Sequence, residues 1–401
     1  MRDESWNVEV AIEQRSPRDE LPPAEPASSL NHVFVFLEIF SLEGGIQSYV
    51  KDILQAYSSL VGGADVFLLR DGAGVKNPLE SSSLRFHYLK SRSAALGRLR
   101  LAVSLLSYLL TNRPQRVFCG HIKLAPLVRM LCKPLKIPYT VLTYGKEVWE
   151  PLSAQQQKTL QHADRIWTIS RYSRDRACAA NGIDPSRVEM LSCAIDGTAF
   201  TPGMKSPDLI DRYQLANSKV LMTVARLWSG DPYKGVDVTL RALPKIAQAF
   251  PEVKYLVIGR GDDQPRLVQL AQDLGMGDRV VFAGFVPTED LVAHYRLADA
   301  YVMPSQEGFG IVYLEAMSCG IPVLSGDADG SADPLQDGQL GWQVPHRNPE
   351  AVAAACIEIL KGDDQRCDGT WLRERSLAIF DKPAFAQRVQ KLAREPQGLT
   401  D

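Results

Sequence analysis

Two glutamates beside a glycine-rich turn are the residues of this sequence best suited to bind a polar ligand. Glu307 and Glu315 lie in residues 304–323, a stretch that also contains Gly308 and Gly310. The apolar run before it predicts a buried parallel strand, and the residues after the glycines have helical spacing. Strand, turn and helix N-terminus would present backbone N–H groups to a phosphate, with the carboxylates as acceptors for hydroxyls. A ligand with phosphates at one end and hydroxyls at the other is a nucleotide sugar.

Two further glycine turns follow predicted strands. Gly44 and Gly45 come after the apolar residues 33–37 and begin a second helical pattern. A missing side chain there would let the backbone approach a ligand, and a tight turn that needs a positive φ is the alternative. Gly259 closes a later strand in a Gly-x-Gly sequence, which is weak evidence by itself.

The elements that must position these residues alternate regularly between strand and helix. Six or seven such units before residue 205, and a similar series after it, predict an α/β fold with parallel, doubly wound sheets. A chain of 401 residues is too long for one ordinary core, so we expect two domains. Their predicted bounds are 30–205 and 206–380. The polar residues 1–29 are predicted to form a disordered tail.

Composition narrows the class of protein. The sequence is typical of a globular protein, with 45% hydrophobic and 23% charged residues. Its net charge of −2 lacks the excess of positive charge typical of nucleic-acid binding. The seven cysteines are scattered and form no Cys-x-x-Cys pair, which disfavours structural zinc and fits a reducing cytosol. No uninterrupted apolar stretch of about 18 residues and no signal-peptide layout is present. We therefore expect a cytoplasmic protein.

Positive charge is concentrated in residues 86–136, which contain ten basic residues and no aspartate or glutamate. The rest of the chain therefore carries −12. Interleaved leucines make the segment amphipathic, which suits docking on anionic lipid at about 1 kcal/mol per basic residue. A helix packed in the core with solvated arginines is the alternative, and the sequence leaves both open. The basic residues are Lys90, Arg92, Arg98, Arg100, Arg113, Arg116, Lys123, Arg129, Lys133 and Lys136.

The stretch around Glu307 and Glu315 resembles the C-terminal signature of retaining glycosyltransferases of family 4. Those enzymes have the GT-B fold, in which two Rossmann-like domains face each other across a cleft. The resemblance spans residues 31–395 and is strongest over 220–325. It implies that Glu307 contacts sugar hydroxyls, that Glu315 binds the donor ribose, and that a last helix within 381–401 crosses back onto the first domain.

The resemblance implies roles for other residues. Arg226 and Lys234 would neutralise the donor diphosphate, a task that needs side-chain cations because no Asp-x-Asp motif for a metal is present at an appropriate strand end. Ordinary surface charge is the alternative. Gly45 would approach the diphosphate and acceptor, and His121 would touch the transferred sugar or acceptor, unless it only caps the next helix. The remaining implied donor contacts are Gly259, Phe285 and Val286 near the base, and Phe309, Gly310 and Ile311 near the diphosphate.

The sequence also departs from the family pattern. Tyr144 stands where relatives have the histidine of a His-Gly-Asp/Glu turn, which puts a catalytic role of that turn in doubt. Residues 329–333 match only incompletely a Gly-Gly and Glu of relatives. Ala225 replaces a glycine, and Arg260 replaces an acidic residue.

These observations predict a metal-independent, retaining glycosyltransferase. It would move a hexose from a UDP- or GDP-sugar to a hydroxyl of a glycan or lipid-linked acceptor in polysaccharide or glycolipid synthesis. Family resemblance implies front-side attack. The alternatives are a sugar-nucleotide epimerase of the same fold and a non-catalytic nucleotide- or lipid-binding module. We expect a cytoplasmic location, with peripheral contact to an anionic inner membrane face as a further hypothesis.

Overall fold

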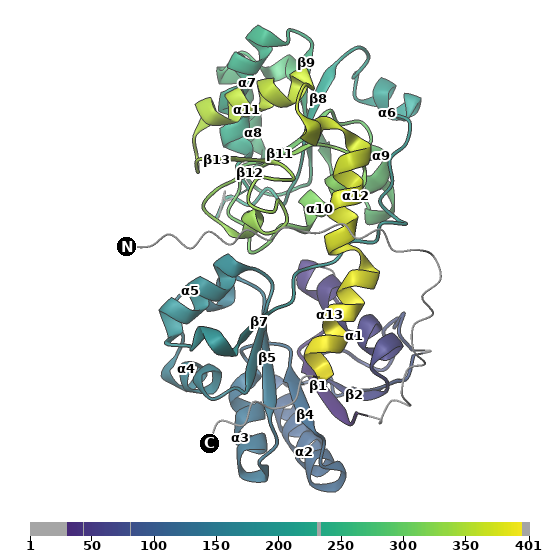
Figure 1. Ribbon diagram of the computed structural model, residues 1–401, viewed down its shortest axis with the longest axis vertical. Helices are drawn as coiled ribbons and strands as arrows, with labels where there is room; N and C mark the ends of the chain where they lie inside the picture. Colours follow the sequence, from purple (N-terminus) through teal and green to yellow (C-terminus); the bar gives the residue numbers. More distant parts are fainter. Residues whose placement is uncertain (1–29, 43, 81, 231–233, 395–401) are drawn as a thin grey trace, which may run out of the picture.

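The computed structural model describes residues 30–42, 44–80, 82–230 and 234–394. The predicted tail, residues 1–29, lies outside this part of the chain. The described residues form two parallel sheets, each flanked by helices, one in each half of the molecule (Figure 1). The predicted fold class is confirmed.

The first sheet has seven strands in the order β3-β2-β1-β4-β5-β6-β7, all paired in parallel. Its strands are β1 (His32–Phe36), β2 (Ala64–Leu68), β3 (Leu84–Tyr88), β4 (Arg116–Cys119), β5 (Tyr139–Thr143), β6 (Arg165–Thr168) and β7 (Val188–Met190). The helices are α1 (Gly45–Leu60), α2 (Ala94–Asn112), α3 (Ala125–Leu135), α4 (Ala154–Gln161) and α5 (Arg171–Asn181).

The second sheet has six parallel strands in the order β10-β9-β8-β11-β12-β13. Its strands are β8 (Lys219–Val224), β9 (Val253–Ile258), β10 (Val280–Gly284), β11 (Ala300–Met303), β12 (Val323–Gly326) and β13 (Trp342–Val344). The helices are α6 (Pro207–Arg212), α7 (Val236–Ala249), α8 (Gln264–Asp273), α9 (Leu291–Tyr295), α10 (Ile311–Ser318), α11 (Pro349–Lys361) and α12 (Gly369–Phe380).

The strands form where the sequence has short apolar runs because both faces of a parallel sheet are covered by helices. All five residues of β1 and of β5 are buried. The helices are amphipathic instead, and α1 buries Tyr49, Ile53 and Tyr57 at helical spacing. Full burial of each such side chain contributes about 1.5–3 kcal/mol.

A last helix, α13 (Lys382–Arg394), lies beside α1 of the first domain, whereas the preceding α12 belongs to the second (Figure 1). Phe385 of α13 is buried with its ring centroid 6.0 Å from that of Tyr49. The Lys382 ammonium lies 3.2 Å from the Asp196 carboxylate and 3.6 Å from that of Asp52. A bridge between Ile195 and residue 381 joins the two places where the chain passes from one domain to the other.

Each sheet reverses its strand order at one point, between β1 and β4 in the first domain and between β8 and β11 in the second. Open α/β sheets bind ligands at the carboxyl ends of the strands next to such a point. The segments after β1, β4, β8 and β11 contain Gly45, His121, Arg226 and Glu307. The topology therefore brings the predicted site residues to these two edges.

Candidate functional site between the two domains

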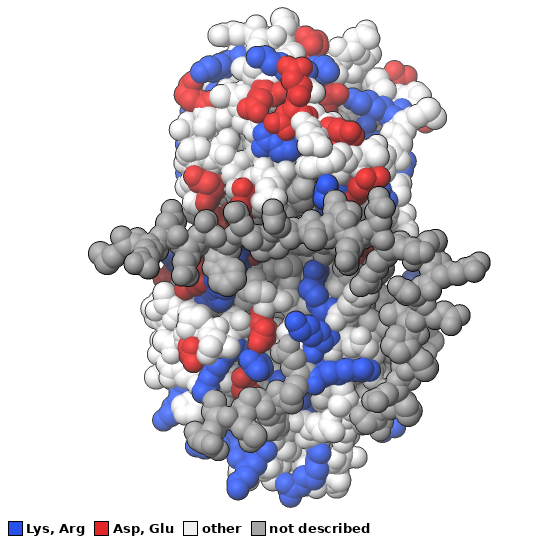
Figure 2. All heavy atoms as spheres, in the orientation of Figure 1, with Lys and Arg blue, Asp and Glu red and all other residues white. Residues whose placement is uncertain are grey.

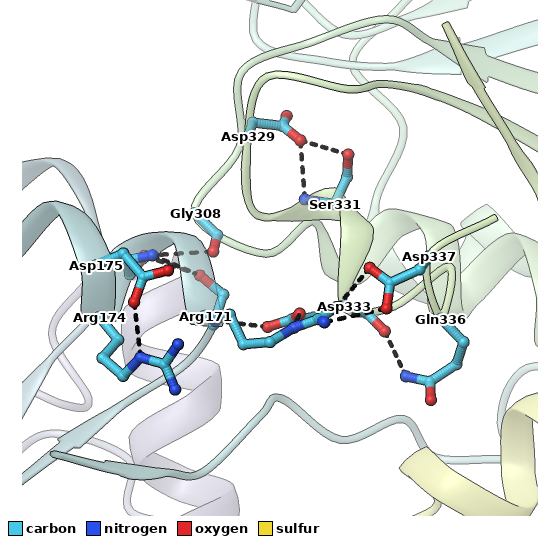
Figure 3. Close-up of polar contacts among 11 residues, drawn as sticks. Arg171, Arg174, Asp175, Gly308, Asp329, Ser331, Asp333, Gln336 and Asp337 are labelled. Carbon is cyan, nitrogen blue, oxygen red and sulfur yellow. Dashed lines mark hydrogen bonds and ion pairs between the residues drawn. The ribbon is translucent and has the colours of Figure 1, made fainter. Parts of the chain in front are cut away.

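The turn that contains Glu307 is fixed by a buried carboxylate. Asp329 accepts the backbone N–H of Glu307 at 2.6 Å and that of Ser331 at 2.8 Å. Figure 3 shows the hydrogen bond between the Asp329 carboxylate and the Ser331 backbone N–H. Gly310 ends the turn with φ 91°, a conformation that favours glycine, and begins α10. Burial raises the pKa of Asp329 to about 6.

The side chains of Lys234 and Glu307 form an ion pair in this turn's pocket. Their exposed fractions are 18% and 15%, so the pair is largely shielded from water. Lys234 precedes α7, and Arg226 follows β8, with its guanidinium carbon 5.4 Å from the ring centroid of Trp228. Lys234 and Glu307 thus meet, and Arg226 lies at the same edge of the second sheet. These are charges of the kind needed to hold a diphosphate and a hydroxylated sugar.

Two adjoining pockets contain most of the predicted residues. The larger one, about 1190 Å³, is lined by Arg226, Lys234, Gly259, Phe285 and Val286, and also by Gly45 of the first domain. The smaller one, about 390 Å³, is lined by Glu307, Phe309, Gly310 and Ile311, again with Lys234 and Gly45. Because both domains contribute, the two pockets form one cleft between them.

Gly45 begins α1 without a backbone conformation or a close contact that requires glycine. Neither Gly44 nor Gly45 has a φ in the left-handed region: Gly44 is extended, with φ 168°. The alternative of a turn that requires positive φ is therefore wrong. A Cβ at Gly45 would meet no atom within 4 Å among the described residues, so the position opens onto the cleft.

Glu315 does not line either pocket. Its carboxylate accepts the Tyr295 hydroxyl of α9 at 2.6 Å, and burial raises its pKa. Val312, three residues earlier on α10, lines both pockets. Glu315 is thus half-buried next to this pocket-lining residue, and its ribose contact stays a prediction.

His121 is likewise absent from the lining of both pockets. It follows β4, and its Nδ1 accepts the backbone N–H of Lys123 at 3.0 Å, the local bond expected of a capping histidine. Burial, together with Lys123 and Arg70, lowers the pKa of His121 to about 4. The imidazole is therefore neutral at pH 7, and its contact with sugar or acceptor stays a prediction.

Tyr144, which replaces the expected histidine, has a structural role. Its hydroxyl donates to the Gly120 carbonyl at 2.7 Å, and its backbone N–H donates to Glu147 at 2.5 Å. Burial raises the pKa of Tyr144 far above its usual range, so the phenol stays protonated. Tyr144 is also among the residues that line the smaller pocket.

A cross-domain ion-pair group beside the cleft was not predicted. Arg171 of α5 pairs with Asp333, and its guanidinium also lies 2.7 Å from Asp337 (Figure 3). Its backbone N–H donates to Asp333 at 2.7 Å. Close by, Ser173 donates to the carbonyl of Gly308, next to Glu307. The incomplete family match at residues 329–333 was a signal for this region, whereas nothing distinguished Arg171 from other arginines.

Metal ligands are not gathered in the described part of the chain, which contains no group of three or more His, Cys, Asp or Glu side chains placed to hold an ion. The cysteines are all free thiols. Metal independence remains a prediction, which rests on Arg226 and Lys234 as the cations of the cleft.

Two facing Rossmann-like domains with a polar cleft at both points of strand-order reversal are the architecture of GT-B glycosyltransferases. Two family models match the chain: "Glycosyl transferase 4-like domain" over residues 44–194 and "Glycosyl transferases group 1" over residues 218–362. The chain belongs to this family of glycosyltransferases, the group 1 or family 4 type.

Curated proteins of similar sequence are also glycosyltransferases. Over 267 residues the chain is 33% identical to a GDP-mannose-dependent alpha-(1-6)-phosphatidylinositol monomannoside mannosyltransferase of Mycolicibacterium smegmatis, covering 63% of this chain and 68% of that protein. It is 33% identical over 211 residues to a D-inositol 3-phosphate glycosyltransferase of Mycobacteroides abscessus, covering 51% and 46% of the two chains. Several of these alignments thus span about half to two thirds of the relatives' own length.

Solved structures share the fold. HepE of Anabaena, solved in complex with UDP, has a TM-score of 0.74 at 21% identity, over 90% of this chain and 99% of that one. Sucrose-phosphate synthase of Thermosynechococcus elongatus has a TM-score of 0.71 at 21% identity, over 91% and 98%.

Proposed function

We propose that this glycosyltransferase moves a hexose, with retention, from a GDP- or UDP-sugar to a hydroxyl of a lipid-linked or glycan acceptor. The observation that carries the proposal is the Lys234–Glu307 ion pair beside Arg226 in the interdomain cleft. Arg226 and Lys234 hold the diphosphate and stabilise the charge that develops on it, and Glu307 accepts sugar hydroxyls. Glu315 binds the ribose, and Phe285 and Val286 lie at the base.

For a retaining transfer, the lining of the smaller pocket favours front-side attack over a double displacement. Glu307 is the one carboxylate among its described lining residues, and it is already paired with Lys234. A double displacement would need a free carboxylate on the far face of the sugar. In the proposed step the acceptor oxygen bonds to the anomeric carbon on the face that the phosphate leaves. The acceptor proton passes to the leaving phosphate oxygen.

The names of the mycobacterial relatives favour GDP-mannose as donor. The test is an incubation of the full chain with a panel of GDP- and UDP-hexoses, with phosphatidylinositol in detergent or a free polyol as acceptor. We expect transfer with one donor class, and an α-linked product by NMR. A β-linked product would refute retention. Conversion of the donor to another sugar without acceptor would indicate the epimerase, and donor binding without turnover the non-catalytic module.

Attachment to an anionic membrane is the second part of the proposal. Helix α2 has one buried face, but a second row of side chains 3–4 positions apart is 38–59% exposed: Leu96, Leu99, Val103, Leu106 and Leu110. Among the described residues, α2 is the one helix whose length and composition alone would suffice to cross a membrane, with a mean hydropathy of 1.3 over an 18-residue window of which 22% is buried within the protein. A row of apolar side chains beside basic ones is typical of a helix lying in the lipid interface.

The charges around this row are fewer than the sequence predicted. Arg116 is buried in β4, where it donates to Thr140, and Arg129 is half-buried, so neither faces lipid fully. The other eight residues of the basic segment are exposed. In Figure 2, Lys and Arg gather over the lower part of the molecule, where Figure 1 places α2 and α3.

Vesicle co-sedimentation tests the attachment. Leu99→Gln together with Val103→Gln should weaken binding to anionic vesicles at least tenfold, while Met204→Gln, at an exposed position outside α2, should not. Binding should also fall with salt. Binding that ignores lipid charge, salt and the α2 substitutions would refute the membrane contact.

A further inference from the structure

The two walls of the smaller pocket differ in chemical character. The second domain contributes Lys234, Glu307 and the glycine turn that follows Glu307. No charged residue of the first domain is among the described residues that line this pocket. Besides Gly45, the first domain contributes Ile46, Tyr49, Tyr144, Ile169 and Cys193. A sugar in the pocket would therefore meet charged groups on one side and largely apolar residues on the other.

The ends of three neighbouring strands and the start of one helix build this first-domain wall. Tyr144 directly follows β5, Ile169 directly follows β6, and Cys193 lies three residues after β7; these strands are adjacent in the sheet. Ile46 and Tyr49, three positions apart on α1, share one face of that helix. Ligands of open α/β sheets bind at the carboxyl ends of the strands, so these residues occupy positions that face a ligand.

The polar atoms of this wall are already bonded within the protein. The Tyr49 hydroxyl donates to the Leu191 carbonyl at 2.5 Å, and the Tyr144 hydroxyl donates to the Gly120 carbonyl at 2.7 Å. Burial raises the pKa of the Cys193 thiol to about 12, so the thiol stays uncharged and is only a weak donor. A sugar hydroxyl buried against this wall without a partner would lose the free energy of its hydration.

This wall lies directly opposite the Glu307 turn. A Cβ at Gly308, next to Glu307, would lie 3.4 Å from Cδ1 of Ile169 and 2.9 Å from the carbonyl oxygen of Tyr144. The rings of Tyr49 and Tyr144 pack edge to face, with their centroids 5.9 Å apart. A sugar whose hydroxyls reach Glu307 therefore has its remaining substituents close to the wall.

One substituent of a hexose suits such a wall. In the proposed donor complex, the anomeric carbon is attached to the diphosphate, and Glu307 accepts ring hydroxyls. A hexopyranose ring carries one carbon substituent, C6. A methyl group at C6 gains free energy from apolar burial, whereas a CH₂OH group brings an oxygen to a wall whose polar atoms are already bonded. An acetamido group would bring two polar atoms there. The wall therefore favours a methyl group at C6.

We infer that this pocket selects a 6-deoxyhexose, with its C6 methyl group against Ile169 and Cys193. The inference rests on the proposed function and adds the chemical class of the transferred sugar to it. Tyr144 supports it, because a phenol that donates to Gly120 stands where relatives have a histidine. The mannose in the relatives' names differs from 6-deoxymannose, a member of this class, by one oxygen atom.

Isothermal titration calorimetry on the full chain tests the inference with two matched pairs of donors. The pairs are GDP-mannose with GDP-6-deoxymannose and UDP-glucose with UDP-6-deoxyglucose, and the members of each differ by one oxygen atom. In the pair whose nucleotide the protein binds, we expect the 6-deoxy sugar to bind about 10- to 100-fold more tightly. The double variant Ile169→Thr/Cys193→Ser places two hydroxyls in the wall and should reduce this advantage at least fivefold.

The matched control is Ile183→Thr/Cys178→Ser, the same two changes at positions of the first domain that do not line the pocket, and it should keep the advantage. Thermal unfolding checks that both variants fold, and Cys193→Ser alone serves if the double variant does not. The inference is refuted if the 6-hydroxylated sugar binds as tightly as its 6-deoxy counterpart, if the nucleotide binds but neither sugar of its pair does, or if the wall variant keeps the full advantage. Failure to bind both GDP and UDP counts against the proposed function instead.

Discussion

Breaking the Lys234–Glu307 ion pair should affect stability and activity in separable ways. Both side chains are less than one-fifth exposed, so solvent screens the pair weakly. At an effective dielectric constant of about 20, two unit charges about 4 Å apart attract by about 4 kcal/mol before desolvation is subtracted. Removing one partner leaves the other side chain partly buried and without this opposite charge beside it.

We expect Lys234→Met and Glu307→Gln each to lower the free energy of unfolding by about 1–3 kcal/mol. The double variant removes both charges, so it should be no less stable than the less stable of the two single variants. This corresponds to a coupling energy of about 1–3 kcal/mol between the two substitutions. In a domain of this size, each kcal/mol shifts Tm by about 2–4 °C, which thermal unfolding followed by fluorescence resolves.

Activity should show no such compensation. Each single variant should lower kcat/KM by about 10²–10³, the cost of losing one preorganised contact to the transition state, and the double variant should not recover. Initial rates of transfer from the preferred nucleotide sugar measure this. Lys245→Met with Glu350→Gln is the matched control, because that pair lies on the surface of the same domain, with exposed fractions of 52% and 75%. It should change neither quantity much.

Two results would refute this reasoning. Strictly additive losses of stability would mean that the two side chains do not interact in solution. A single variant at either position with near-normal kcat/KM would mean that the pair does not contact the donor.

Three further predictions concern the surroundings of the cleft. Burial raises the pKa of Asp329 to about 6. We therefore expect kcat/KM to rise as the pH passes 6, because the ionised carboxylate holds the Glu307 turn. The pH profile of Asp329→Asn should lack this rise. The folded-state pKa exceeds that of the unfolded chain, so this ionisation also lowers stability as pH rises toward 6, and Asp329→Asn should flatten that slope. Arg171→Ala should raise the KM for donor about fivefold, equivalent to about 1 kcal/mol of domain closure, with kcat less affected; an unchanged KM would contradict the role of Arg171 in closure. Phe385→Ala should lower stability by about 3–5 kcal/mol, measured by urea unfolding, and a loss below 1 kcal/mol would show that α13 does not depend on this contact.

The sheet strands were predictable because buried parallel strands are short apolar runs. The strand predicted at residues 33–37 is β1, which lies one residue earlier at His32–Phe36. Strand β13, three residues long, was missed because so short a run carries no periodic signal.

The residues of the site were less predictable than the fold. Spacing and resemblance identified the cleft residues next to strand ends, such as Arg226 and Glu307. The contacts of Arg171 with Asp333 join residues 162 positions apart, and no local pattern encodes such a pairing. The same holds for Asp329, whose carboxylate holds a turn 22 residues away.

The bridge between Ile195 and residue 381 has a consequence for how the protein opens. The chain passes between its two lobes twice, and backbone hydrogen bonds of 2.9 and 3.2 Å tie the two passages side by side. Two adjacent connections that are hydrogen-bonded to each other form a hinge. They permit one domain to rotate relative to the other about the line of the two connections, but they resist translation and separation of the domains. Opening of the cleft would then separate Arg171 from Asp333 while α13 remains packed against α1. Product release would therefore need only a rotation of one domain relative to the other.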